Sequence, residues 1–162
     1  MWLLSDPESE YNKRKHEIND RIVDQSLQIL KSEHESSLKK SNYMHLKTEW
    51  KQEQYIESTE YADTICLLKF RTDNHRLPVE TGRYQNVEFK DRLCHECKME
   101  VGDKFHYLFS CPLFKAEREE LIPPKYRNRP NVYKYKALLG HTDIKILRKL
   151  CRFIKIITKS IN

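Results

Sequence analysis

Four residues of the sequence have the spacing of a complete set of zinc ligands. Cys94, Cys97, His106 and Cys111 follow the pattern C-x2-C-x8-H-x4-C. Zinc binds four sulfur or nitrogen donors in a tetrahedron, and two cysteines separated by two residues can present both thiolates from one tight turn. The five-residue step from His106 to Cys111 is little more than one helical turn, so we expect a short helix there. A site with four protein ligands leaves no open position, which indicates a structural metal.

Other interpretations of these residues compete with the zinc site. The cysteines and the histidine could be ordinary buried side chains, or Cys94 and Cys97 could form a disulfide. His95 is an alternative ligand, but direct neighbours rarely both reach one ion, which favours His106. Disulfides are typical of secreted proteins, and the short apolar run before Ser5 does not resemble a secretory signal. We therefore expect an intracellular chain, in nucleus or cytoplasm, that uses its cysteines for metal.

The sequence around these ligands resembles a known protein family. The similar segments are 67–71, 75–84, 92–94 and 105–112, with Arg118 behind them. Together they resemble the zinc-binding region near the C-terminus of non-LTR (LINE-type) retrotransposon reverse transcriptases of invertebrates. The resemblance covers residues 66–118, about a third of the chain, and family ligands correspond to the four residues named above. Lys104 departs from the family, whose members often have an acidic residue there.

The resemblance implies a module downstream of a polymerase. Such a module helps to bind element RNA or target DNA during target-primed reverse transcription. The resemblance therefore implies a nucleic acid as partner, and a possible upstream polymerase domain of the same polyprotein as a second partner. Polymerase catalysis needs paired aspartates that hold two magnesium ions. Residues 61–64 imitate the Tyr-Ala-Asp-Asp core, but Thr64 replaces the second aspartate. We expect no catalytic activity of this chain, and Tyr61, Ile65 and Leu68 at helical spacing are expected to face the core.

Composition predicts a mainly α fold with a thin core. Only 38% of the 162 residues are hydrophobic, 33% are charged and three are glycine. Helices should dominate, because alternating apolar runs are short and glycine is scarce. We predict an irregular helical domain with one small structural zinc knuckle and a basic C-terminal helix. The two cysteines outside the motif, Cys66 and Cys151, are expected to be buried hydrophobic residues rather than nucleophiles. No apolar stretch is long enough to span a bilayer, so no membrane partner is expected.

Three parts are expected along the chain. Residues 1–57 should form a charged helical arm, residues 58–122 the zinc-binding module of reverse-transcriptase type, and residues 123–162 a basic helical tail. The arm should begin with Asp6 as N-cap and Pro7 in the first turn, and should carry a narrow apolar stripe to about residue 38.

Proline, asparagine and glycine set the expected breaks between later elements. Residues 73–92 contain Pro78 and Gly82 and are expected to form a loop or a short hairpin. Prolines at positions 123, 124 and 130 should interrupt the chain after the zinc helix. Asn131 should begin another helix and Gly140 should end it.

The basic charge is concentrated at the C-terminus. Residues 121–162 contain 11 Lys and Arg but one acid, Asp143, whereas residues 1–120 contain 19 basic and 23 acidic residues. After Asp143, a good helix cap, the cations that recur at steps of three and four are Lys145, Arg148, Arg152, Lys155 and Lys159. Leu147, Leu150, Ile154, Ile157 and Ile161 recur likewise on another face. Such a helix can bury its apolar side and present cations to phosphates, with Tyr126, Tyr133 and Tyr135 as possible stacking platforms.

Less specific interpretations of the basic helix stay open. It could be a solvated face, or it could lie on an anionic membrane or in a partner groove. Arg76 and Arg83 flank the proline and glycine segment, which has few apolar residues to pack, so we expect them to support nucleic-acid binding. The sequence thus predicts a zinc-containing, non-catalytic region that binds RNA or DNA. The rival hypothesis is a protein-interaction module in which zinc only staples helices.

Overall fold

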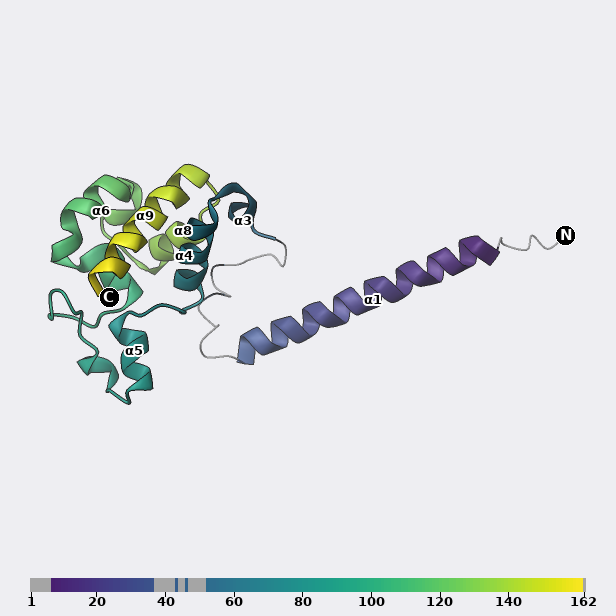
Figure 1. Cartoon of the computed structure of the whole chain (residues 1–162), viewed down its shortest axis with the longest axis horizontal. Coiled ribbons are helices and arrows are strands. Elements are labelled where there is room, and N and C mark those ends of the chain that lie inside the picture. The colour runs from purple at the N-terminus through teal and green to yellow at the C-terminus, as the bar shows by residue number, and fades with distance from the viewer. Residues whose placement is uncertain (1–6, 37–42, 44–45, 47–51, 162) are drawn as a thin grey trace. The chain divides into compact units, whose positions relative to one another are not determined.

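The computed structural model describes residues 7–36, 43, 46 and 52–161 of the chain. The chain divides into two compact units, Met1–Ser41 and Asn42–Asn162. Helices dominate both (Figure 1). The described residues contain no β-strand, and Leu93 and Val101 form an isolated antiparallel bridge. The predicted mainly α fold is confirmed.

The first unit contains one long helix, α1 (Pro7–Ser36). It begins at the predicted proline, while the expected cap Asp6 lies outside the described residues. The stripe of apolar side chains is solvent-facing: Ile18, Ile22 and Ile29 are all more than half exposed. Glu8 and Glu10 in the first turn stabilise the positive end of the helix dipole. α1 is therefore a charged helix whose apolar stripe is exposed.

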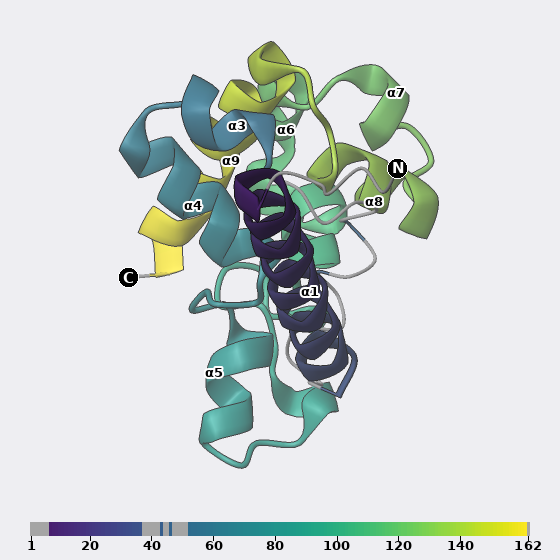
Figure 2. The ribbon, with the colours of Figure 1, turned by 90° about the vertical axis from the view of Figure 1, so that its right-hand side faces the viewer.

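The second unit is built from short helices around one longer helix. In chain order they are α3 (Gln54–Ser58), α4 (Tyr61–Arg71), α5 (Pro78–Tyr84), the 3₁₀ turn η1 (Phe89–Asp91), the π-helical turn η2 (His106–Ser110), the 3₁₀ turn η3 (Pro112–Phe114), α6 (Lys115–Leu121), α7 (Pro124–Arg127), α8 (Val132–Leu139) and α9 (Ile144–Ile161). α9 packs against α3, α4 and α6, so it is the central helix of the core (Figure 2).

The sequence of α9 explains its position. Asp143 caps the helix, since its carboxylate accepts the backbone N–H of Lys145 at 2.8 Å. The apolar residues that follow lie on one face, as predicted from their spacing. The buried side chains of α9 are Leu147, Leu150, Cys151, Phe153, Ile154 and Ile157. Most are fully buried against the neighbouring helices, which makes this face the main source of hydrophobic stabilisation.

Our prediction of which face of α4 is buried is wrong. Tyr61 is 82% exposed and Leu68 is 38% exposed, while Ile65 is only partly buried. The buried residues of α4 are Thr64, Leu67, Phe70 and Arg71. Two of these, Thr64 and Arg71, are polar and have hydrogen-bond partners, so hydrophobic spacing could not identify the face. The hydroxyl of Thr64, for example, lies 2.6 Å from that of Thr59.

Arg71 ties the start of the second unit to its core. The side chain is 1% exposed, and its guanidinium donates to Glu53 at 2.7 Å and lies 4.6 Å from the ring centroid of Tyr55. The Tyr43 hydroxyl donates to the same carboxylate at 3.0 Å. These contacts draw the segment around residue 53 into the second unit, so the unit boundary falls after Ser41, whereas the predicted arm extended to residue 57.

The segment 73–92 differs from the predicted loop or hairpin. Pro78 occupies the first turn of the helix α5, a position where its fixed φ angle favours helix formation. Gly82 lies inside this helix because the Arg92 side chain crosses it: a Cβ atom would lie 2.6 Å from Arg92 Cγ. Arg92 donates to the carbonyls of Val79 and Val87, both at 2.9 Å. Glycine therefore marks a close approach here rather than a turn.

The predicted breaks after the zinc module are confirmed. α6 ends at Leu121 before the two prolines, and Asn131 caps α8 by accepting the backbone N–H of Lys134 at 3.0 Å. Gly140 follows the end of α8. No helix within the described residues is long and apolar enough to cross a membrane.

Candidate metal centre

Cys94 and Cys97 lie on a tight knuckle at the tip of a short antiparallel loop. The N–H of Cys94 donates to the Glu100 carbonyl at 2.8 Å, and the N–H of Lys98 donates back to the Cys94 carbonyl at 3.0 Å. Lys98 adopts a left-handed backbone with φ of 54°, which reverses the chain directly after Cys97. Gly102 permits this loop to approach α5, since a Cβ atom there would lie 2.7 Å from Pro78 Cγ.

The other two candidate ligands lie on and directly after the π-helical turn η2. The N–H of Cys111 donates to the His106 carbonyl at 2.8 Å, which is the i to i−5 bond of a π-helix. In an ordinary α-helix, five residues rotate by about 500°, which leaves the two side chains roughly 140° apart. The wider π turn reduces this angle. The predicted helix is present, and its π form explains how a five-residue step can aim both ligands at one point.

The fold brings all four predicted ligands together. The ligand atoms of Cys94, Cys97, His106 and Cys111 lie within 4.8 Å of one another. Cys94 Sγ is 3.9 Å from Cys111 Sγ, and Cys97 Sγ is 3.3 Å from His106 Nε2. A zinc tetrahedron with Zn–S bonds of about 2.3 Å and Zn–N bonds of about 2.0 Å has edges of about 3.5 to 3.8 Å. The cluster can therefore hold a metal ion without a large rearrangement.

Hydrogen bonds fix the orientation of the His106 ring. Its Nδ1 lies 2.8 Å from a carboxylate oxygen of Glu100, which leaves Nε2 directed at the cysteines. The backbone N–H of His106 donates to Asp103 Oδ1 at 2.7 Å and so anchors the start of the π turn. A carboxylate that accepts the second N–H of a ligating histidine is a common feature of metal sites, because it selects the tautomer and raises ligand basicity.

Arg118 of α6 holds the C-terminal end of the π turn. Its buried guanidinium donates to the carbonyls of Leu108 at 2.8 Å, Cys111 at 2.7 Å and Tyr107 at 3.4 Å. The carbonyls at a helix end otherwise lack partners. A zinc ion with three thiolates and a neutral imidazole carries a single negative charge, so the cation of Arg118 also offsets the charge of a loaded site.

Burial and hydrogen bonding shift the pKa values of the two innermost thiols, Cys94 and Cys111, in opposite directions. Burial alone would raise the pKa of Cys94, but hydrogen bonds from the Tyr107 hydroxyl and from the backbone of Cys97 and Glu96 outweigh it and lower that pKa. Burial raises the pKa of Cys111, and the neighbouring Cys94 adds to the effect. Tyr107 stays protonated because burial raises its pKa. The site is thus prepared to stabilise at least one thiolate, the form that binds metal.

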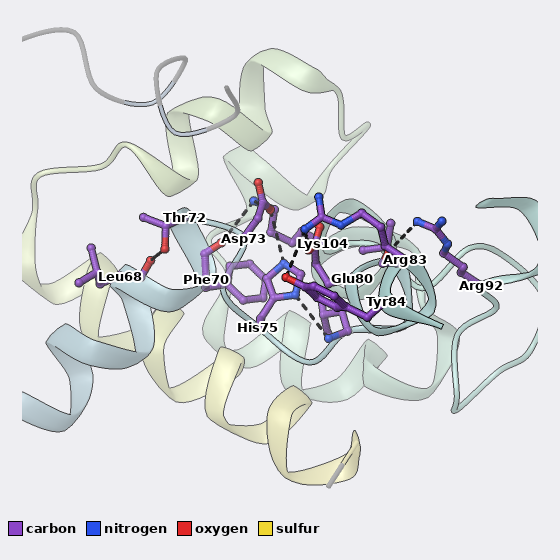
Figure 3. A network of polar contacts seen from close by, with 12 residues as sticks. Leu68, Phe70, Thr72, Asp73, His75, Glu80, Arg83, Tyr84, Arg92 and Lys104 are labelled. Atoms are coloured by element: carbon purple, nitrogen blue, oxygen red, sulfur yellow. Dashed lines mark hydrogen bonds and ion pairs between the residues drawn. The ribbon is translucent and has the colours of Figure 1, made fainter. Parts of the chain in front are cut away.

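A buried polar network lies beside the centre and includes Lys104. Its side chain is 8% exposed; the ammonium pairs with Asp73 and donates to the Phe70 carbonyl at 3.3 Å (Figure 3). His75 Nε2 lies 3.5 Å from the same carboxylate, and His75 Nδ1 accepts the N–H of Leu77 at 3.4 Å. Lys104 is therefore an internal link between the candidate metal centre and the end of α4.

The predicted nucleic-acid residues of the central segment lie outside the metal cluster. Arg83 is on α5, where it pairs with Glu80 at 3.1 Å and lies 5.3 Å from the ring centroid of Tyr84. Arg76 is exposed in the connection between α4 and α5.

The predicted row of cations on α9 is largely solvent-facing. Lys145, Arg148, Arg152 and Lys159 are exposed. Lys155 is only half-exposed and pairs with Asp63 of α4, so part of its charge is already balanced inside the protein. Of the three tyrosines, Tyr133 is 84% exposed, whereas Tyr126 is buried against His141 and Tyr135 is partly buried. The proposal that Tyr126 stacks on a base is therefore wrong.

The supporting residues of the centre were harder to predict than the ligands. Glu100, Asp103 and Tyr107 lie between the ligands, but nothing in their spacing indicated their roles. Arg118 stood out through the family resemblance alone. No protein-family model, curated protein or solved structure matches this chain.

Proposed function

We propose that the cluster of Cys94, Cys97, His106 and Cys111 binds one structural zinc ion. Three sulfurs and one imidazole nitrogen are the donor set that zinc prefers, and the set fills a tetrahedron without a position for water or substrate. The His106–Glu100 contact and the Arg118 clamp support this assignment, because both fit a loaded, negatively charged site. Zinc would join the knuckle to the π turn and so hold η2 against the core.

We further propose that the chain is a non-catalytic, nucleic-acid-binding C-terminal region of a LINE-type reverse transcriptase, or a fragment derived from one. The exposed basic face of α9, whose opposite face is buried, carries the nucleic-acid part of this proposal, and the LINE-type assignment depends on the sequence resemblance. From Lys145 to Lys159 the helix rises by about 21 Å, enough to face several phosphates of one strand. The cations lie in a segment with a single acid, and that acid is the helix cap.

Salt dependence of binding tests this proposal. Arg148, Arg152 and Lys159 changed together to Gln lose three exposed charges while the buried face of α9 is retained. For single-stranded RNA or DNA, the slope of log affinity against log salt should become shallower by about 2, since each phosphate contact contributes about 0.7. A matched control changes Lys13, Arg14 and Lys15 of α1 to Gln, which removes the same charge elsewhere. An equal change of slope in both variants would refute a specific role for α9.

The rival function is a zinc-stapled protein-interaction module, and α1 favours it. Its exposed isoleucines form a stripe on a 30-residue helix, as expected for a face that packs on a partner. A polymerase domain of the same polyprotein is the partner to test. If Ile22→Asp abolishes binding of that domain, and the wild-type chain binds no nucleic acid at low salt, the interaction function replaces the one proposed above.

A further inference from the structure

A groove of about 700 Å³ lies between α4, the C-terminal half of α9 and the connection at residues 74–77. Ala62 and Ile65 of α4 line one side, and Ile154 and Ile161 of α9 line the other. The volume falls within the range of about 300 to 1,000 Å³ that is typical of sites for small organic ligands. The groove is thus large enough for a nucleoside and part of its phosphate chain.

The residues that line the groove are complementary to an anionic ligand that also has a flat apolar part. Lys69, Arg76 and Lys155 lie at the groove, and none of the described residues that line it is acidic. Lys69 and Arg76 are both exposed, so a negative group can approach them from solvent, and an apolar group would lie nearest to the isoleucines.

The polar network beside the metal centre holds the rim of this groove. Asp73, in a left-handed backbone conformation with φ of 56°, pairs with the buried Lys104. His75 accepts the Leu77 N–H, and its ring lies 5.5 Å from that of Phe70 (Figure 3). These contacts fix the backbone on both sides of Arg76. A rim held in this way needs little ordering when a ligand binds, which favours affinity.

We infer that the groove receives one unpaired nucleotide of a single strand, with its base among the apolar side chains and its phosphate at Lys69 and Arg76. The inference rests on the proposed nucleic-acid function and makes it specific for unpaired strands. Lys155 belongs both to the α9 row and to the groove, so a strand that follows the exposed cations of α9 is led to the groove. Only an unstacked base can enter such a site, because a base within a duplex is covered by its neighbours.

The test compares single-stranded and duplex binding by variants that fill the groove. Ala62→Phe places a ring in the groove without changing charge, and Ala137→Phe makes the same change on an exposed position of α8 that does not line it. Fluorescence anisotropy would be measured with a labelled RNA of about 12 nucleotides and with a hairpin duplex. Ala62→Phe should bind the single strand roughly tenfold more weakly, with duplex binding unchanged.

Further variants keep the test valid if phenylalanine disturbs the fold. Ala62→Leu fills less space, and Lys69→Gln removes a charge at the rim, with Lys115→Gln on α6 as its matched control. Each should weaken single-strand binding two- to fivefold or more, whereas the control should not. Melting temperature and zinc content would show that each variant is folded.

Three results would overturn the inference. If all groove variants bind the single strand as the wild type does, the groove takes no base; the proposed function still stands if the α9 variant binds more weakly. If the wild-type chain binds neither nucleic acid at low salt, the proposed function fails as well. If the groove variants lose binding of an acidic amphipathic peptide but retain single-strand binding, the groove belongs to a protein partner.

Discussion

Replacement of Arg118 by methionine should destabilise the second unit and weaken metal binding. Methionine keeps most of the buried volume but removes charged donors from three carbonyls, those of Tyr107, Leu108 and Cys111. Each hydrogen bond to a charged group contributes about 1.5 to 3 kcal/mol, and the cost of burying the guanidinium offsets part of the sum. We expect a loss of about 3 kcal/mol in the free energy of unfolding, a large share of a typical stability of about 5 to 15 kcal/mol.

Urea unfolding of the zinc-loaded protein, followed by circular dichroism, measures this loss. A parallel titration with a competing chelator measures zinc affinity, which should fall because the Cys111 backbone is no longer held. Arg148→Met is the matched control, since Arg148 is exposed on α9, and it should change stability by less than about 0.5 kcal/mol. Arg118→Lys, with one charged group and no planar fork, should be intermediate. If Arg118→Met matches the control, the clamp does not stabilise the π turn.

Three other changes test the metal centre and its surroundings. Cys97→Ser or Cys111→Ser should abolish stoichiometric zinc binding and unfold the knuckle. Elemental analysis would measure the loss of zinc, and circular dichroism would measure the unfolding. Wild-type protein that contains no zinc after purification without chelator would contradict the site. Lys98→Gly should raise the free energy of unfolding by up to about 1 kcal/mol, because φ at Lys98 is 54°; thermal melting that shows a loss would contradict this account. Lys104→Met should cost about 3 to 5 kcal/mol in urea unfolding, since the Asp73 carboxylate stays buried without the ammonium that balances its charge; a neutral result would contradict a stabilising role for the Lys104–Asp73 pair.

The candidate ligands could be predicted because a zinc site requires a particular spacing of its cysteines and histidine. Cys94 and Cys97 are separated by the two residues that a knuckle needs, and the structure places all four ligand atoms together. The amphipathic α9 could be predicted for a similar reason, because its apolar residues repeat at helical steps and Asp143 precedes them. In both cases the determining pattern is local in sequence.

The errors occurred where distant residues decide local structure. Gly82 and Pro78 are compatible with a loop, but both lie in the helix α5, and the side chain of Arg92 packs against Gly82. On α4, the buried face includes Arg71, whose charge is balanced by Glu53, a residue 18 positions earlier in the chain. Local hydrophobicity contains no information about such partners, so it could not identify either feature.

The metal centre and the groove share the Lys104–Asp73 ion pair. Lys104 precedes the ligand His106 by two residues, and Asp73 precedes Arg76 by three, so one buried contact joins the start of the π turn to the groove rim. The ion pair is almost fully buried, and a buried charge without its partner is strongly unfavourable. Displacement of the π turn would therefore also disturb the backbone that presents Arg76. If the proposed zinc ion holds the π turn in place, it would also help to set the shape of the groove through residues 103–106 and 73–77.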